Sequence, residues 1–238
     1  MIDINCDVGE GINNEHLIMP LITSCNISCG AHAGSQEDID KVIGLAIKNN
    51  VKIGAHPSFP DRENFGRKEM DLSHLELQNS LEKQLLFFKE RADLQNTPIH
   101  HVKPHGALYN LIAVNSEVAT VIVKAIKTVF TDINIYVPYN SEIEKVAKNN
   151  GLNVTYEVFA DRNYNNDLTL VSRSLPCAII QNKKQVLEHV KMMAYQSEVK
   201  TIQGSVKFIK AQTFCIHGDH KNSVEILEFL HQYLNNSN

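Results

Sequence analysis

Side chains that can donate or accept protons at neutral pH occur in short groups along this 238-residue chain. The groups are Asp7 and Glu10; His32; His56; Lys103 and His105; Glu157, Asp161 and Arg162; and His217 and Asp219. Imidazoles and carboxylates perform general acid and base catalysis, whereas lysine and arginine hold anionic groups. Taken singly, each residue also has a structural explanation, such as a hydrogen-bonded histidine, a helix cap or a solvated lysine.

Most groups directly follow a short run that is rich in apolar and β-branched residues. These runs predict strands at Ile2–Cys6, Ser24–Cys29, Val51–Ala55, Ile99–Lys103, Ile133–Val137, Asn153–Val158 and Thr213–Ile216, with Ala178–Gln181 as an additional candidate. Between them, apolar residues spaced three or four apart predict amphipathic helices, for example through Leu77, Leu81, Leu85 and Phe88.

Alternating strands and helices require a parallel sheet with right-handed crossovers. Closed, this sheet is a barrel of about seven β/α units; open, it is a doubly wound sheet. In either form the carboxyl ends of the strands meet on one face, so the polar groups that follow them predict one site. No linker interrupts the pattern, and we expect residues 1–238 to form a single domain.

Two connections, Pro57–Leu72 and Phe159–Pro176, are unusually long and polar. The first contains the sequence Phe-Gly-Arg at 65–67, and the second contains two arginines and an Asn-rich turn. Long loops in compact domains are often functional, so we expect both to contribute to the site.

Composition excludes several functions. The chain has 23 Lys and Arg against 27 Asp and Glu, a formal net charge of -4 and no basic cluster, which argues against binding to nucleic acid or to a membrane surface. No stretch approaches the length of a membrane span and no export signal follows Met1, so we expect a cytoplasmic protein. The five cysteines lack Cys-x-x-Cys spacing, and we interpret them as reduced thiols packed as small hydrophobes.

Several cofactor motifs are absent from the sequence. It contains no P-loop, no dinucleotide Gly-x-Gly-x-x-Gly, no His-Glu-x-x-His and no nucleophile elbow. A divalent metal stays open as an alternative, since Asp7, His32, His56 and His217 offer suitable donor atoms. Their spacing alone does not select a metal, and we assign no metal ligand.

The same residues lie in segments by which the chain resembles the LamB/YcsF family. The segments are Asn5–Glu10, Asn26–Gly34, Ile53–Pro57, Pro60–Asp61, Phe65–Arg67, His101–Asn110, Glu157–Arg162 and His217–Asp219, in order over almost the whole chain. Ala31, Ser35 and Leu168 depart from the family, which usually has Phe, Asp and Gly there. The resemblance implies a seven-stranded β/α barrel like that of glycoside hydrolases and polysaccharide deacetylases.

The resemblance also implies a reaction: cleavage of 5-oxo-L-proline to L-glutamate, coupled to ATP hydrolysis, together with partner subunits B and C. The catalytic residues expected on this basis are Asp7, Glu10, His32, His56, Lys103, His105, Glu157, His217 and Asp219. The residues expected to bind substrate are Asn5, Asp61, Arg67, Asp161 and Arg162. Since the chain has no P-loop, ATP binds either in an atypical pocket here or on a partner.

Two other functions fit the same residues. One is a metal-dependent amidase or deacetylase that acts on a carbohydrate. A bound divalent ion, and loss of activity when a chelator is added, would support this function. The other is a non-catalytic scaffold for subunits B and C. A scaffold does not need acidic and imidazole side chains at its strand ends, which argues against it.

Lys103 and His105 are the pair of residues for which the sequence most clearly indicates a role in catalysis. They flank Pro104 at a predicted strand end, so the two-residue period of a strand points both side chains to one side. In a barrel that side is the interior mouth, where burial would lower both pKa values and a carboxylate such as Glu157 would raise them. We expect replacement of either by alanine to leave the fold intact and lower activity. At a solvated strand end, neither property would change.

Overall fold

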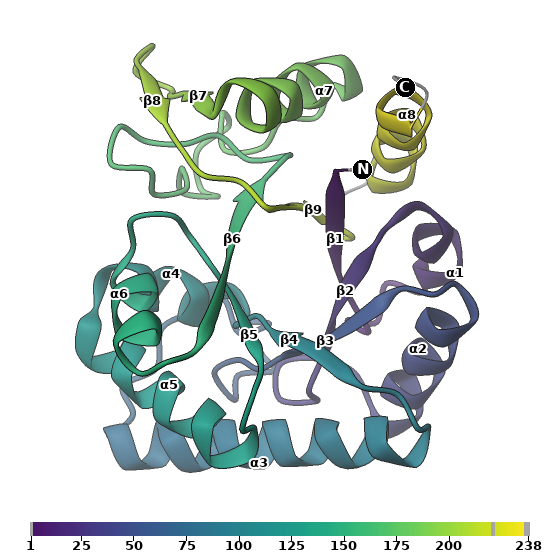
Figure 1. The fold of residues 1–238 in the computed structure, drawn as a ribbon, viewed down its shortest axis with the longest axis vertical. Coiled ribbons are helices and arrows are strands. Elements are labelled where there is room, and N and C mark those ends of the chain that lie inside the picture. Colours follow the sequence, from purple (N-terminus) through teal and green to yellow (C-terminus); the bar gives the residue numbers. More distant parts are fainter. Residues whose placement is uncertain (1, 220–221, 236–238) are drawn as a thin grey trace.

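Seven parallel strands form a closed barrel in the computed structural model, which describes residues 2–219 and 222–235 (Figure 1). The strands are β1 (Asp3–Val8), β2 (Ser24–Ser28), β3 (Lys52–His56), β4 (Ile99–Val102), β5 (Asn134–Val137), β6 (Asn153–Phe159) and β9 (Thr213–His217). They follow this order around the barrel, and β9 pairs with β1 to close it. The predicted seven-stranded barrel is confirmed. The open doubly wound sheet is wrong, because its two edge strands would not pair.

Helices connect the strands and cover the outside of the barrel (Figure 1). They are α1 (Glu15–Ile18), α2 (Gln36–Lys48), α3 (His74–Leu94), α4 (Gly106–Val114), α5 (Ser116–Val129), α6 (Glu142–Asn149), α7 (Lys183–Lys191) and α8 (Ser223–Asn235). Their apolar faces and the strands form the core, in which Leu81, Leu85 and Phe88 of α3 are fully buried. Four of the five cysteines are also buried, whereas Cys177 is exposed, so the expectation that all five pack as hydrophobes is wrong there.

The sequence located every barrel strand to within two residues of its bounds. The additional strand at Ala178–Gln181 is wrong: within it, only Ile179 forms an isolated bridge, to Arg162. The sequence also missed an antiparallel hairpin of β7 (Glu198–Lys200) and β8 (Val206–Phe208), between β6 and β9 along the chain. Three-residue strands are too short for an alternating pattern to be recognised.

A polar layer fills part of the barrel interior. Asn26 donates to Asn5 Oδ1 at 2.7 Å, and the His101 Nε2–Asn26 Oδ1 distance is also 2.7 Å. The His101 ring stacks on Tyr136 with 3.8 Å between ring centroids. Gly54 makes room for this stack, because a Cβ atom at position 54 would lie 2.1 Å from His101 Nε2. These buried polar groups satisfy one another, as a buried network must.

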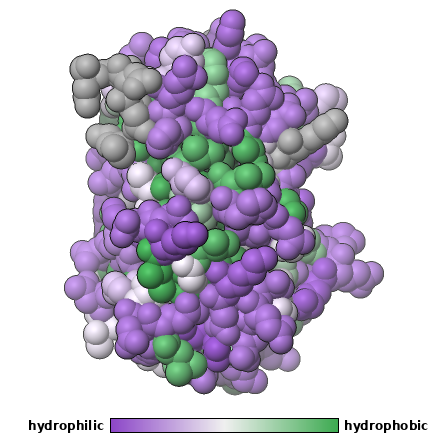
Figure 2. Space-filling view, turned by 90° about the vertical axis from the view of Figure 1, so that its right-hand side faces the viewer, coloured by the Kyte–Doolittle hydropathy of each residue, from purple (hydrophilic) through white to green (hydrophobic). Residues whose placement is uncertain are grey.

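The face that carries α8, α1 and α2 is mainly hydrophilic, with an apolar area in its upper half (Figure 2). Among the described helices, none alone has the length and apolarity needed to cross a membrane. Helices α4 and α5 meet those criteria only as a pair, and they are bent by 119° relative to each other.

Candidate active site

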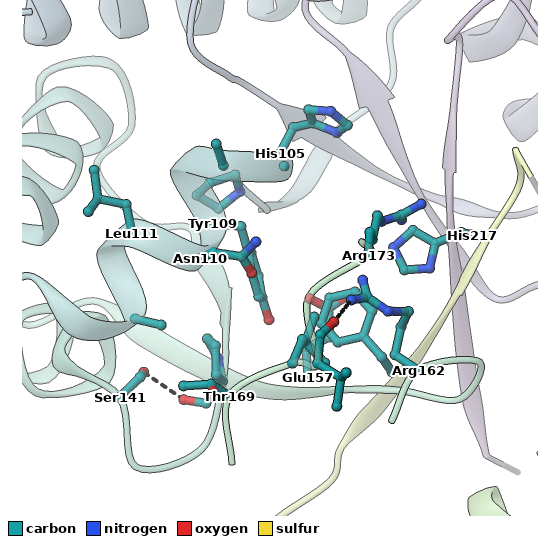
Figure 3. A pocket seen from close by; sticks show the side chains of 18 of the residues that line it. His105, Tyr109, Asn110, Leu111, Ser141, Glu157, Arg162, Thr169, Arg173 and His217 are labelled. Carbon is teal, nitrogen blue, oxygen red and sulfur yellow. Dashed lines mark hydrogen bonds between the residues drawn. The ribbon is translucent and has the colours of Figure 1, made fainter. Parts of the chain in front are cut away.

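A cavity of about 700 Å³ lies at the carboxyl ends of the barrel strands (Figure 3). Its wall includes ten of the residues singled out above: Asp7, Glu10, His56, Arg67, Lys103, His105, Glu157, Arg162, His217 and Asp219. Tyr109 and Asn110 lie on one side, with Arg173 and His217 opposite (Figure 3). The volume suits a small ligand. The barrel thus brings the strand ends together in one place, as its topology requires.

Lys103 and His105 both line this cavity because the backbone ladder continues past the end of β4. Lys103 N donates to Ala55 O, and His105 N donates to Pro57 O, each at 2.9 Å. The alternation of a strand is therefore kept for two further residues, and both side chains face inward. Lys103 is 2% exposed, so a solvated strand end is excluded for it.

The Lys103 ammonium lies in a cluster of buried acidic groups and sulfur. Its Nζ is 2.8 Å from Asp7 Oδ1, 3.0 Å from Glu157 Oε1 and 3.1 Å from Cys215 Sγ. Burial alone would lower the lysine pKa, but the charges of Asp7, Cys215 and Glu157 outweigh it and hold that pKa well above its ordinary value. Lys103 is therefore a fixed positive charge. It also lies between Asp7 and Cys215, where a metal would otherwise find donor atoms.

Glu157 and Tyr109 line the cavity with hydrogen-bonding capacity that the described residues do not fully use. Glu157 Oε1 is close enough to Lys103 for an ion pair, yet neither Glu157 oxygen accepts a well-aligned hydrogen bond within the described residues. The buried Tyr109 hydroxyl lies beside the Glu157 carboxylate and makes no other hydrogen bond within the described residues. Burial raises the pKa of Tyr109, and the nearby Glu157 carboxylate raises it further, so the hydroxyl keeps its proton. Buried polar groups usually have their hydrogen-bonding capacity filled, so a ligand that bonds to Glu157 or Tyr109 would stabilise this part of the cavity.

Three histidines surround Glu10 beside this cluster. Glu10 Oε1 lies 3.1 Å from His32 Nε2 and 3.3 Å from His105 Nδ1, and His105 Nδ1 lies 3.0 Å from His56 Nε2. Burial would raise the Glu10 pKa, but the hydrogen bonds from His105 and His32 outweigh it and the pKa is well below its ordinary value. Burial lowers the pKa of His32 to about 4 despite the adjacent carboxylate.

The turn at 65–67 closes over these imidazoles. Phe65 O accepts from His105 Nε2 at 2.9 Å, and the Arg67 guanidinium pairs with Asp219. Gly66 has a φ of +62°, and a Cβ there would lie 3.0 Å from the His105 ring and 3.1 Å from His32. Only glycine fits that conformation and that space without strain.

His217 is held by Asp161. The Asp161 carboxylate accepts from the backbone N of His217 and from its ring Nδ1, with each distance 3.0 Å. Burial would raise the Asp161 pKa, but the charge of His217 and these hydrogen bonds lower it to about 2. Since Nδ1 carries the donated hydrogen, Nε2 is the nitrogen of neutral His217 that can accept a proton. A base oriented by a carboxylate in this way is a recurring catalytic arrangement.

Arginines form one wall of the cavity. Arg162 is buried and donates to Val171 O at 2.6 Å and to Ala178 O at 3.2 Å. Burial and the neighbouring Arg173 charge lower the pKa of Arg162 to about 10. Two guanidinium groups in proximity favour an anionic ligand between or beside them.

The structure places four of the expected residues behind the cavity wall. Asn5 belongs to the polar layer inside the barrel, where it donates to Thr213 Oγ1 at 2.8 Å. Asp61 accepts from the backbone and side chain of Asn64, so it shapes a loop. His32 contacts Glu10 from behind, and Asp161 holds His217. Direct substrate binding by Asn5, Asp61 or Asp161 therefore does not follow from their positions.

Tyr109 and Arg173 line the cavity, although neither was assigned a site role from the sequence. Tyr109 lies one turn into α4, so its distance from the strand end hid it, although it falls within the segment His101–Asn110. Arg173 is one of the two arginines of the long, polar loop Phe159–Pro176, which was expected to contribute to the site as a whole. Leu168, in the same loop, has a φ of +68°, which glycine would adopt more easily.

The closed barrel and its charged, imidazole-rich cavity place the chain among β/α-barrel proteins with a site at the carboxyl ends of the strands. Within that class the chain belongs to the LamB/YcsF family, whose model matches residues 2–238.

Known relatives extend this assignment. The 5-oxoprolinase A subunit of Haemophilus influenzae (strain PittEE) is 39% identical over 224 residues, which covers 94% of this chain and 91% of the relative. The same-named protein of Neisseria meningitidis serogroup A (strain DSM 15465 / Z2491) is 38% identical over 233 residues, covering 98% of this chain and 95% of the relative.

Solved structures agree. The lactam utilization protein from Thermus thermophilus superimposes with a TM-score of 0.92 at 32% identity, covering 98% of this chain and 96% of the other. A GH113 beta-1,4-mannanase, 10% identical with a TM-score of 0.52, covers 97% of this chain and 98% of its own and shares the fold alone. The expected likeness to glycoside hydrolase barrels is thereby confirmed at the level of the fold.

Proposed function

We propose that this chain is the component of an ATP-dependent 5-oxoprolinase that opens 5-oxo-L-proline to L-glutamate. The names of its relatives, the 5-oxoprolinase A subunit and the lactam utilization protein, support this reaction class. The observation that carries the proposal is the group Asp7, Lys103, Tyr109 and Glu157 in the cavity wall, where Lys103 lies between the two carboxylates and Glu157 and Tyr109 keep hydrogen-bonding capacity for a ligand.

The chemistry of lactam opening explains why this group of charged and polar side chains is useful. A lactam is a resonance-stabilised amide, and its opening needs a driving force that ATP can supply by phosphorylating the amide oxygen. Water then adds to the carbon of the phosphorylated amide, the carbon–nitrogen bond breaks and the nitrogen takes up a proton, which leaves an acyl phosphate. A second water hydrolyses the acyl phosphate to the carboxylate and free phosphate. Two waters and one ATP are consumed overall, yielding glutamate, ADP and phosphate.

Each part of the cavity has a role in this scheme. Glu157 accepts the hydrogen bond from the ring N–H, and Tyr109 donates to an oxygen of the substrate. Arg162 and Arg173 face the substrate carboxylate. The fixed charge of Lys103 stabilises negative charge on the oxygen of the reacting carbon.

His217 transfers the proton, because Asp161 fixes its tautomer and leaves Nε2 as the basic nitrogen. A ring nitrogen of His217 lies within 4.8 Å of a carboxylate oxygen of Asp7 and of Cys215 Sγ. His217 is therefore close enough to exchange a proton with a substrate bound beside Lys103. Asp7 stays ionised, because the charges of His56 and Lys103 keep its pKa low against the effect of burial.

Partner subunits B and C complete the enzyme in this proposal. The chain has no P-loop, so ATP binds either in an atypical pocket of this chain or on a partner, and we expect the chain alone to turn over 5-oxo-L-proline poorly. The assembly works in the cytoplasm, where ATP is supplied.

The test is glutamate release from 5-oxo-L-proline plus ATP, assayed with the purified chain alone and with both partners. We expect glutamate from the complete mixture and little or none from the chain alone. Full ATP-coupled production by the chain alone would contradict the role of the partners. No glutamate from an assembled complex would contradict the reaction itself.

A further inference from the structure

One ring nitrogen of His56 and one ring nitrogen of His105 each form a hydrogen bond to a backbone carbonyl oxygen. His56 Nδ1 lies 2.7 Å from Lys103 O, and His105 Nε2 lies 2.9 Å from Phe65 O. A carbonyl oxygen only accepts hydrogen bonds, so each of these nitrogens carries a hydrogen. In a neutral imidazole the other nitrogen then has a lone pair and no hydrogen.

The two remaining nitrogens face each other across a short distance. His56 Nε2 and His105 Nδ1 are 3.0 Å apart, and Glu10 Oε1 lies 3.3 Å from the second and 3.8 Å from the first. These three electron-rich atoms thus converge with no hydrogen between them when both rings are neutral, and Asp7 Oδ2 is a further acceptor 3.5 Å from His56 Nε2. Such an arrangement is stabilised either by a metal ion at its centre or by one extra proton, which would let His105 donate to Glu10 Oε1.

The geometry points to a binding site for one divalent transition-metal ion of the zinc type, with Glu10, His56 and His105 as ligands. This inference goes beyond the proposed function and does not depend on the identity of the substrate. Zinc bonds of about 2.0–2.2 Å in a tetrahedron place neighbouring ligand atoms about 3.3–3.6 Å apart. The distances of 3.0, 3.3 and 3.8 Å bracket that range.

The surroundings of the two histidines fit the same conclusion. Metal-binding histidines almost always donate their other ring N–H to a carbonyl or a carboxylate, as both rings do here. Imidazole ligands suit zinc, iron and nickel better than magnesium or calcium. All three ligands line the cavity, so a fourth coordination position would face it.

Charge balance supports a divalent ion. Asp7, Glu10 and Glu157 are buried carboxylates in this region, and Lys103 is the buried ammonium that contacts two of them. With neutral histidines the cluster of these four groups has two excess negative charges. Buried charge without compensation is costly, and one divalent cation would neutralise it.

His32 positions Glu10 and is not a fourth ligand. Its ring stacks on His105 with 3.9 Å between centroids and 4° between planes, so one ion cannot lie in both ring planes. His32 Nε2 lies 3.1 Å from Glu10 Oε1, and His32 is absent from the cavity wall. Groups that orient a ligand in this way typically change metal affinity about 10–100-fold when mutated.

The competing explanation is a single proton shared by His56 and His105, which would make the pair an imidazole–imidazolium couple. The two explanations differ in whether the purified chain binds a metal ion. They also differ in whether cobalt, a spectroscopic substitute for zinc, shows the visible absorption of a tetrahedral site.

The test uses the full chain, stripped with a chelator and titrated with Co²⁺. We expect one tetrahedral Co²⁺ per chain, displaced by Zn²⁺, and binding at least about 100-fold weaker in His105→Ala. Glu10→Gln, which keeps the side-chain shape, should weaken binding at least about tenfold. His74→Ala, at an exposed histidine on α3, is the matched control and should bind like the parent. Circular dichroism checks folding, and affinity of Glu10→Gln equal to the parent, or no tetrahedral spectrum, would overturn the site.

Discussion

Replacing Lys103 with methionine removes the ammonium that lies between two buried carboxylates. Asp7 and Glu157 are 8% and 2% exposed, so water cannot replace the lost charge. Removing one partner of a buried ion pair typically costs about 3–5 kcal/mol, a large part of the about 5–15 kcal/mol that stabilises a domain. The expectation from sequence, that a Lys103 variant keeps the fold, stays a prediction; we add that the variant should be about 3–5 kcal/mol less stable than the parent.

The assay is urea unfolding at pH 7, followed by circular dichroism, for Lys103→Met, Glu157→Gln and the double variant. Neutralising Glu157 removes one of the stranded charges, so the double variant should be more stable than the sum of the single effects predicts. We expect a coupling of at least about 1 kcal/mol. Lys148→Met is the matched control, because Lys148 pairs with Glu144 on the surface and such pairs contribute little.

Two results would refute this reasoning. One is a change in Lys103→Met no larger than that in Lys148→Met, which would mean that the buried charges are hydrated or neutral. The other is additivity in the double variant, which would mean that Lys103 and Glu157 do not interact.

Three further predictions follow from other contacts. Gly54→Ala should cost about 1–3 kcal/mol in urea unfolding, because the new Cβ meets His101; an unchanged midpoint would contradict the tight packing. Burial lowers the pKa of His189 to about 4 from 6.5, so the unfolded state binds its proton first and stability falls as pH drops from 6.5 to 4, by about 3 kcal/mol. Between pH 6.5 and pH 4, the His189→Leu variant should lose correspondingly less stability than the parent. The same pH dependence in both proteins would contradict this prediction. Asp161→Asn should lower turnover of the assembled enzyme at least about tenfold, and the double variant with His217→Gln should be little slower than His217→Gln alone. Fully additive losses would show that the two residues act independently.

Much of the architecture was predictable because it depends on local patterns. Apolar runs located the strands, and strand–helix alternation indicated a parallel sheet whose carboxyl ends converge. The sequence could not decide between closure and an open sheet, because closure depends on pairing between β1 and β9, which are far apart in the chain.

The side-chain layers were less predictable. Asn5 and Asp7 alternate on one strand and share one face, yet Asn5 joins the polar layer inside the barrel and Asp7 reaches the cavity. His32 and His56 both follow strand ends, but the loop after β2 carries His32 behind Glu10. How deep a side chain lies within the barrel depends on the stagger of the strands and on the path of the loops. Neither can be inferred from the residue types near that position.

The loop residues show the same limit. Arg173 approaches the cavity only because the long connection after β6 folds back over it, and no periodic pattern marks that path. Asp61 follows a strand end and looks like a site residue, but its carboxylate is used by Asn64. Residue type indicated the chemistry, whereas the contacts decided which groups remain available to a ligand.

The central claim is that this cavity opens the lactam ring, and Glu157→Gln in the reconstituted complex tests it most directly. The substitution keeps the shape of the side chain but replaces a negatively charged acceptor that pairs with Lys103 by a neutral amide. With subunits B and C bound and ATP and 5-oxo-L-proline saturating, glutamate formation should fall at least about 100-fold, equivalent to about 2.7 kcal/mol of barrier. Glu117→Gln, at an exposed carboxylate, should match the parent. Turnover of Glu157→Gln within threefold of the parent would contradict the account.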